Sequence, residues 1–189
     1  YLLYLNVDRE HIDFYKSYSN FKSKIKKYIY EQSQKDSKIF INNDDYFLSS
    51  LKKYSGNIKT FGSNSDANYN YKLIKLTNKR SYFNFLIGKK ILSKNLSTNL
   101  LGEHNVQNLT AVLSIIDDLG YKIKKSHILS FKGTKRRMNI LGKLKKTIFI
   151  DDYAHHPTEI EKLIKVISLY KKKIVCLIIE PHRYSRLND

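Results

Sequence analysis

The chain has 189 residues, 41% of them hydrophobic, which is enough for one large domain or two modest ones with a real core. No apolar run approaches the ~18 residues of a membrane-spanning helix, and no signal-peptide pattern opens the chain, so we expect no membrane partner. The formal net charge of +18 first suggests a nucleic-acid partner, but most of the 35 basic residues are lysines spread along the chain. We interpret them as a solvated surface and keep a non-catalytic nucleic-acid-binding module as an alternative.

The two ends of the chain and its lone cysteine indicate what kind of protein the chain comes from. The chain opens in the apolar run YLLYLNV without an initiator Met and stops just past another apolar run, so we expect a piece of a longer protein. Cys176 lies inside an apolar run, where it is expected to be a buried small hydrophobe. A single cysteine offers no disulfide framework and fits a reduced, cytoplasmic protein.

The first two thirds of the chain alternate strand and helix patterns. Apolar residues at helical spacing predict a helix over 17–32, and a second helix is expected over 44–54. A β series runs from about 67 to 94 and is followed by an amphipathic helix at 104–118, which Gly120 caps, and by a shorter helix at 124–131. The remaining expected strands lie at 1–7, 38–42 and 57–62.

The last third predicts a new β series after a basic turn, and we place a domain boundary there, between residues 1–136 and 137–189. LGKLKKTIFIDD suggests a pair of strands, and Pro157 with acidic residues in the following turn predicts a helix start. The continuous apolar run IVCLII at 174–179 is typical of a strand buried on both faces. Together these elements predict a parallel, right-handed βαβ unit.

The rare residues gather in a few short stretches. Five of the six histidines lie in REHID, GEHNVQN, DDYAHHP and EPHRYSR. Four of the six arginines lie in GTKRRMN and EPHRYSR, and both prolines lie in DDYAHHP and EPHRYSR. DDYAHHP and EPHRYSR each follow the carboxyl end of an expected parallel strand, the edge at which α/β sheets bind ligands. We therefore expect the two stretches to face each other across a cleft, although capping and turn roles remain open for each residue. A zinc site is disfavoured because HExxH and CxxC are absent.

These motifs, in this order, resemble the Mur ligase family. The resemblance rests on GEHNVQN, FKGTKRRMNILG, DDYAHHPTEI and EPHRYSR and covers almost the whole chain. It implies an α/β fold: the later half of a central ATPase domain, followed by the start of a Rossmann-like C-terminal domain. DDYAHHPTE with PHRYSR resembles the members that join L-alanine to UDP-N-acetylmuramate, whereas Glu180 departs toward the ligase that recycles a murein tripeptide onto the same sugar. The P-loop motif GxxxxGK[ST] is absent, so this stretch alone is not expected to catalyse ligation.

The resemblance also implies a reaction and roles for single residues. The reaction is ATP-dependent amide formation through an acyl phosphate, with ATP and Mg2+ as cofactors, in peptidoglycan precursor synthesis. His11 would ligate Mg2+, with Asp8 and Glu10 as further candidates. The nucleotide would contact residues on both domains, namely His104, Asn105, Asn108, Arg136, Arg137, Asp152 and Tyr153. The catalytic set, which would orient the substrate carboxylates, is His155, Arg183 and Arg186, and the further substrate contacts are His156 and His182.

Some readings stay open from the sequence. His156 is also well placed as a cap of the helix that follows it, and Asn105 and Asn108 could be ordinary capping residues. Besides the two ligase types and the nucleic-acid-binding module, a degenerate or split ligase without activity is a further alternative. The sequence gives neither the oligomeric state nor the metal preference.

Overall fold

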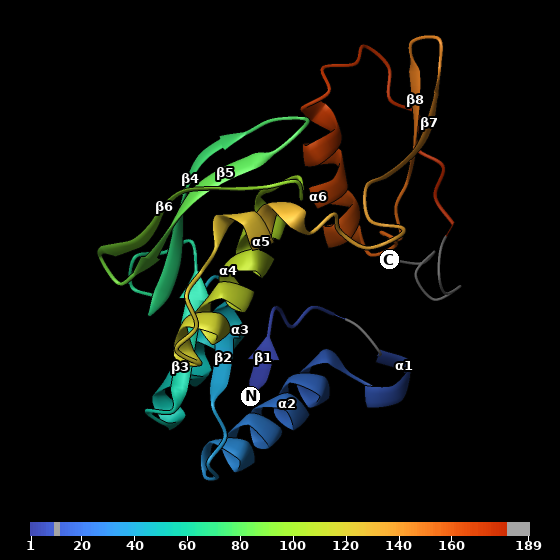
Figure 1. Cartoon of the computed structure of the whole chain (residues 1–189). Coiled ribbons are helices and arrows are strands. Elements are labelled where there is room, and N and C mark those ends of the chain that lie inside the picture. Colours follow the sequence, from blue (N-terminus) through green and yellow to red (C-terminus); the bar gives the residue numbers. More distant parts are fainter. Residues whose placement is uncertain (10–11, 181–189) are drawn as a thin grey trace.

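A mixed six-stranded sheet forms the larger of two units in the computed structural model, which describes residues 1–9 and 12–180 (Figure 1). The strands lie in chain order, and the first four pair in parallel while the last two pair antiparallel. The strands are β1 (Leu2–Tyr4), β2 (Ile39–Asn42), β3 (Ile58–Gly62), β4 (Tyr69–Leu76), β5 (Ser81–Ile87) and β6 (Lys90–Thr98). β1 is shorter than the expected 1–7 strand and only half-buried.

Helices cover both faces of this sheet. They are α1 (Ile12–Tyr15), α2 (Tyr18–Ser33), α3 (Tyr46–Ser49) with the 3-10 turn η1 (Ser50–Tyr54), α4 (Glu103–Asp118) and α5 (Lys125–Ser130). Side chains alternate across β2: Ile39 and Ile41 pack with α2, whereas Phe40 packs with α4. The result is a three-layer arrangement in which the buried phenylalanines Phe40, Phe61, Phe83 and Phe85 form the base for α4.

The smaller unit is a hairpin followed by a helix. β7 (Asn139–Leu144) and β8 (Thr147–Asp151) pair antiparallel, as the sequence predicts, and α6 (Pro157–Ser168) begins at the expected proline. His156 caps α6, with Glu159 completing a capping box. Figure 1 shows α6 lying between the hairpin and the start of α4, so it connects the two units in space.

The expected βαβ unit is wrong in its last strand. Residues 174–180 form no strand, and β8 pairs only with β7 within the described ranges. The cause is the lack of a partner: a strand needs a neighbour for its backbone hydrogen bonds, and apolar residues alone do not supply one. Ile174 and Ile178 are 86% and 96% exposed, and Cys176 is exposed rather than buried.

The end of α4 is fastened to the amino ends of the strands by Asp118. Its side chain is 4% exposed and accepts hydrogen bonds from Tyr1 at 2.8 Å, from Lys38 at 2.9 Å and from Lys59. Burial raises the pKa of Asp118, but these three donors outweigh it and hold that pKa well below its usual value. The carboxylate is thus ionised in the folded protein over the whole ordinary pH range.

Replacing Asp118 by Asn should lower the free energy of unfolding by about 2 kcal/mol at neutral pH, since charge-assisted hydrogen bonds are lost. The folded pKa is depressed, so this contribution is present above about pH 4 and is lost as the pH falls. Denaturant unfolding at several pH values should show the difference shrinking in acid. The exposed Asp36→Asn serves as the control, and equal stability of Asp118→Asn and wild type at pH 7 would contradict the assignment.

Candidate functional site

The two units meet at a small polar cavity of about 150 Å3. One wall follows the carboxyl end of β1, and the other is the first turns of α6. Its polar lining is Asn6, Asp8, His156, Thr158, Glu159 and Lys162. A larger hollow of about 270 Å3 lies on the outer strands and is lined by Ile74, Lys75, Thr77, Tyr82 and Asn95. None of these residues belongs to the histidine and arginine stretches of the sequence, so we place the candidate site in the smaller cavity.

Asp8 connects the two walls of this cavity. Its Oδ2 accepts a hydrogen bond of 2.7 Å from the Thr158 hydroxyl and lies 3.6 Å from Nδ1 of His156. Burial raises the pKa of Asp8, but the Thr158 hydroxyl, the Arg9 backbone N–H and two nearby groups, His156 and Lys162, lower it overall. The site therefore holds an ionised carboxylate at the carboxyl edge of β1.

His104 lies on the first turn of α4, beside the smaller unit. Burial, together with the positive charges of Lys162 and Arg137, lowers its pKa to about 4, although Asp152 opposes them. The imidazole is therefore neutral at pH 7. Val166 of α6 and the His104 ring both pack closely against Gly102, where a Cβ would lie 2.5 Å from Cγ2 of Val166 and 2.9 Å from Cε1 of His104. The φ of Gly102, +91°, is also one that suits glycine.

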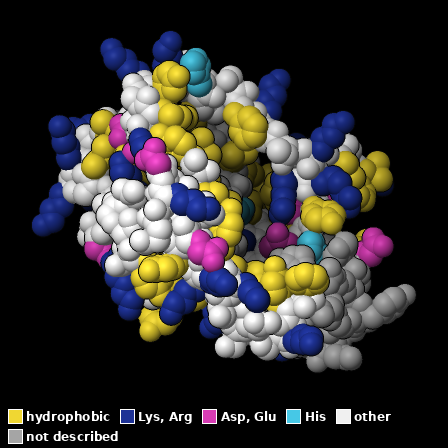
Figure 2. Space-filling view, turned by 90° about the horizontal axis from the view of Figure 1, so that it is seen from below, with side chains coloured by type: hydrophobic (Ala, Val, Ile, Leu, Met, Phe, Trp, Pro, Cys, Tyr) yellow, Lys and Arg dark blue, Asp and Glu magenta, His cyan; other side chains and the backbone are white. Residues whose placement is uncertain are grey.

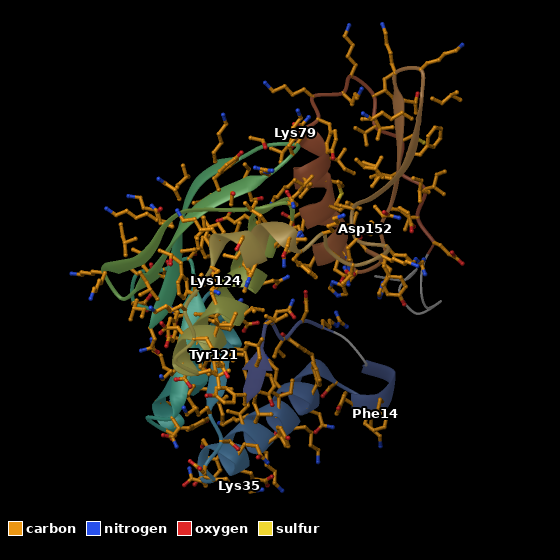
Figure 3. All side chains as sticks on the ribbon, viewed as in Figure 1. Phe14, Lys35, Lys79, Tyr121, Lys124 and Asp152 are labelled. Carbon is orange, nitrogen blue, oxygen red and sulfur yellow. The ribbon has the colours of Figure 1, made fainter. Side chains whose placement is uncertain are left out.

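The Asp151–Glu159 turn is held by its own side chains. Both oxygens of Asp152 accept backbone N–H groups, from Met138 at 2.7 Å and from Ala154 at 2.8 Å. Nδ1 of His155 lies 2.9 Å from the carbonyl of Tyr153. Figure 3 shows Asp152 beside the segment that joins α5 to β7. The carboxylate of Asp152 thus shapes the turn, while its expected nucleotide contact stays a prediction.

Both arginines of the linker lie against this turn. The Arg136 guanidinium stacks 4.9 Å from the ring centre of Tyr153, and its Nε lies 3.8 Å from Asp151. Arg137 pairs with Glu159 at 3.4 Å. Both guanidinium groups remain largely exposed, so they can still receive an anionic ligand.

The remaining site predictions divide into two groups. On α4, the Asn105 amide donates to the carbonyl of Leu101, which precedes the helix, at 2.7 Å, whereas Asn108 is exposed one turn later. The residues that fall outside the described part of the chain are His11, His182, Arg183 and Arg186. No group of three or more possible metal-ligating His, Cys, Asp or Glu residues occurs within residues 1–9 and 12–180.

The sequence analysis missed a polar network at the same sheet edge. Gln107 of α4 donates to Asn42 at 3.2 Å and to Asp44 at 2.8 Å, and Asp44 also accepts the backbone N–H of Ser63. Thr158 and Lys162 were missed as well. The run NNDD directly after a buried strand was the available signal, because it stands at a strand end just as DDYAHHP does.

Two domain families match the chain. The Mur ligase middle domain matches residues 2–116, and the Mur ligase glutamate ligase domain matches residues 136–183. The first of these matches spans more than half of the chain, and the chain therefore belongs to the Mur ligase family.

The similar proteins point to one branch of this family. The chain is 38% identical to the UDP-N-acetylmuramate–L-alanine ligase of Pelagibacter ubique, over 100% of the chain and 42% of the relative. It is 29% identical to the enzyme of the same name from Desulforapulum autotrophicum, over 96% of the chain and 40% of the relative. The chain thus spans about two fifths of the length of the curated relatives it matches.

Solved structures agree in fold. The UDP-N-acetylmuramate-alanine ligase MurC of Thermotoga maritima superposes with a TM-score of 0.72 at 25% identity, covering 91% of this chain and 39% of that one. The MurF ligase of Thermotoga maritima, solved in complex with ADP, gives a TM-score of 0.71 at 20% identity, covering 88% and 38%. In the described part of the chain, no helix is both long and apolar enough to span a bilayer.

The partly buried His104 should make the stability of the fold depend on pH. Its folded pKa of about 4 lies below the unfolded value of 6.5, so its contribution is complete above pH 6.5 and is lost as the pH falls toward 4. Between pH 7.5 and pH 5, wild type should lose about 2 kcal/mol of unfolding free energy that His104→Gln does not lose. Denaturant titrations measure the difference, with exposed His127→Gln as control; parallel pH profiles for wild type and His104→Gln would refute it.

Proposed function

We propose that the protein carrying this chain joins L-alanine to UDP-N-acetylmuramate at the expense of ATP, in peptidoglycan precursor synthesis in the cytoplasm. The observation that carries the proposal is the 38% identity, along the entire chain, to an enzyme of that name. The cavity between two units supports it, because ligation through a reactive intermediate needs a site that closes and excludes water.

The proposed chemistry has two steps. A carboxylate oxygen of the sugar attacks the γ-phosphorus of ATP, and ADP leaves. The amine of L-alanine then attacks the acyl carbon, the C–O bond to phosphate breaks, and the nitrogen loses a proton. Charge stabilisation and positioning dominate such transfers, which suits a site rich in arginine and histidine rather than in nucleophiles.

The nucleotide would lie between the two units. Asn108 offers an exposed amide on α4, which can donate to and accept from a purine edge. Tyr153 and Arg137 offer a half-exposed ring and an exposed guanidinium from the other side. These donors fit adenine and phosphate, and His104 and Asn105 would support the same helix end. We keep the domain boundary at residue 136, where the second of the two family matches begins.

The Mg2+ assignment rests on the resemblance alone. His11 would be the ligand, three residues after Asp8, and the ionised Asp8 gives the neighbourhood a negative charge that suits a divalent cation. His155, Arg183 and Arg186 would orient the carboxylates of the two substrates, with His156 and His182 beside them.

The alternative within the class is a ligase that adds a murein tripeptide to the same sugar, toward which Glu180 departs. Incubating a full-length protein that carries this chain with UDP-N-acetylmuramate, ATP and either L-alanine or tripeptide separates the two. The nucleic-acid alternative finds less support, because Figure 2 shows the Lys and Arg side chains scattered over the visible face rather than joined into one patch.

Arg183→Ala in the full-length protein should reduce ligation by about 100-fold or more, because a bidentate carboxylate contact is lost. The folded state should be preserved, as judged by circular dichroism and thermal melting. Arg80→Ala, which removes an exposed arginine from a remote turn, is the matched control. Wild-type rates for Arg183→Ala would remove Arg183 from the site.

Arg137→Ala should raise the KM for ATP by about tenfold while leaving the KM for the sugar within about twofold. The reason is that its guanidinium stands on the nucleotide side of the junction, next to Glu159. Steady-state kinetics with each substrate varied in turn measure the two constants. An unchanged KM for ATP would count against a nucleotide contact by Arg137.

A further inference from the structure

One side-chain hydrogen bond joins residues 150 positions apart, across the junction of the two units. The hydroxyl of Thr158 donates to Oδ2 of Asp8 at 2.7 Å. Oδ1 of Asp8 accepts the backbone N–H of Arg9, so both carboxylate oxygens are engaged in fixed directions. A hydrogen bond to an ionised carboxylate is stronger than one between neutral groups, and this one is partly buried.

Asp8 is itself held to the sheet edge through its neighbour. The backbone N–H of Val7 donates to Asp45 at 2.8 Å, and the amide of Asn42 donates to the Leu5 carbonyl at 2.8 Å. The loop after β1 is therefore bonded to the end of β2 and to the residue that caps α3. A side chain on this loop is a rigid anchor for whatever binds it.

Thr158 is equally well fixed within the smaller unit. It is the second residue of α6, and its N–H donates to the capping ring of His156 at 3.3 Å. Glu159 completes the cap by accepting the N–H of His156 at 3.5 Å, and it also accepts the N–H of His155 at 3.2 Å. A bond that fixes Thr158 relative to the larger unit therefore also fixes the position of His155 and of the end of the Asp151–Glu159 turn.

The remaining connections between the units are compatible with a hinge. Gly102 and Val166 form a close apolar contact without polar bonds. In the linker, Gly133 has a φ of +90°, whereas the backbones of Arg136 and Met138 are hydrogen-bonded to Tyr153 and Asp152 of the smaller unit. A linker of this kind can rotate about a few residues, while the contact at Asp8 sets where the rotation stops.

We propose that Asp8 and Thr158 are a positioning pair. Their hydrogen bond sets the closed arrangement of the two units and places the Asp151–Glu159 turn, which carries His155, over the carboxyl edge of β1. Neither residue needs to contact substrate for this role. The catalytic purpose of the closed arrangement rests on the proposed function. The hydrogen bond between Asp8 and Thr158 does not, and its effect on the two units can be tested without any substrate.

The test measures the distance between the units in the 189-residue chain. Spin labels are placed on cysteines introduced at Lys35 and Lys146, which are exposed on the larger and the smaller unit, in a Cys176→Ser background. Pulsed electron paramagnetic resonance is recorded with EDTA, so that no divalent cation contributes. Wild type should give one dominant distance.

Thr158→Val removes the hydroxyl but keeps the shape of the side chain, and Asp8→Asn removes the charge. Each should shift the ratio of closed to open molecules by about tenfold toward open, and the double variant should shift it no further than either single variant. Thr158→Ser should restore the wild-type distribution. Ser168→Ala, which removes a hydroxyl from the other end of α6, is the matched control.

Circular dichroism first confirms that each variant is folded. If Thr158→Val does not fold, the distance distributions of Thr158→Ser and Asp8→Asn still test the proposal. A wild-type distance distribution in both Thr158→Val and Asp8→Asn overturns the proposal, as does simple additivity in the double variant. In the full-length protein, Thr158→Val should lower kcat by about tenfold with the KM for ATP nearly unchanged. A protein that shows the distance shift but no ligation with L-alanine would refute the proposed function and leave the positioning pair standing.

Discussion

The parallel pairing of β1, β2 and β3 is the constraint on which the site depends. Parallel strands carry their carboxyl ends to one edge, and there the loop after β1 meets NNDD after β2. Bonds from Val7 to Asp45 and from Asn42 to the Leu5 carbonyl turn these neighbouring loops into one rigid rim. Gln107 extends the rim to α4, so that the helix with His104 and Asn108 is fixed to the same edge.

The second unit brings charges of both signs to this rim. Asp8 and Glu159 are ionised, and Lys162 and Arg137 stand beside them. His104 stays neutral because burial and two nearby cations act in the same direction. Its close packing requires the missing side chain at Gly102, so one glycine links the backbone conformation at the start of α4 to the protonation state of the residue two positions on.

Local signals predicted most elements, because their causes lie within a few residues. The proline and the two acidic residues after His156 were enough to place the start of α6, and a short apolar run was enough for β2, whose four residues are all buried. IVCLII failed because apolar composition does not provide a strand with a hydrogen-bonding neighbour, and that neighbour is set by the whole sheet. Thr158 was missed for the same reason: its role comes from Asp8, which lies 150 residues away.

Charges on the lysine-rich surface and charges in the site differ in how strongly they interact, because the distances between the charged groups differ. A surface charge farther than about 8 to 10 Å from a group is largely screened at physiological ionic strength, so scattered lysines contribute little inside the cavity. Contacts within 4 Å, such as Arg137 with Glu159, are screened less. A surface can thus exchange one charged residue for another, whereas the rim requires a carboxylate at Asp8 and a hydroxyl at Thr158 because each must meet the other at hydrogen-bond distance. The net charge of +18 therefore describes the solvent face of the molecule and does not predict its ligand.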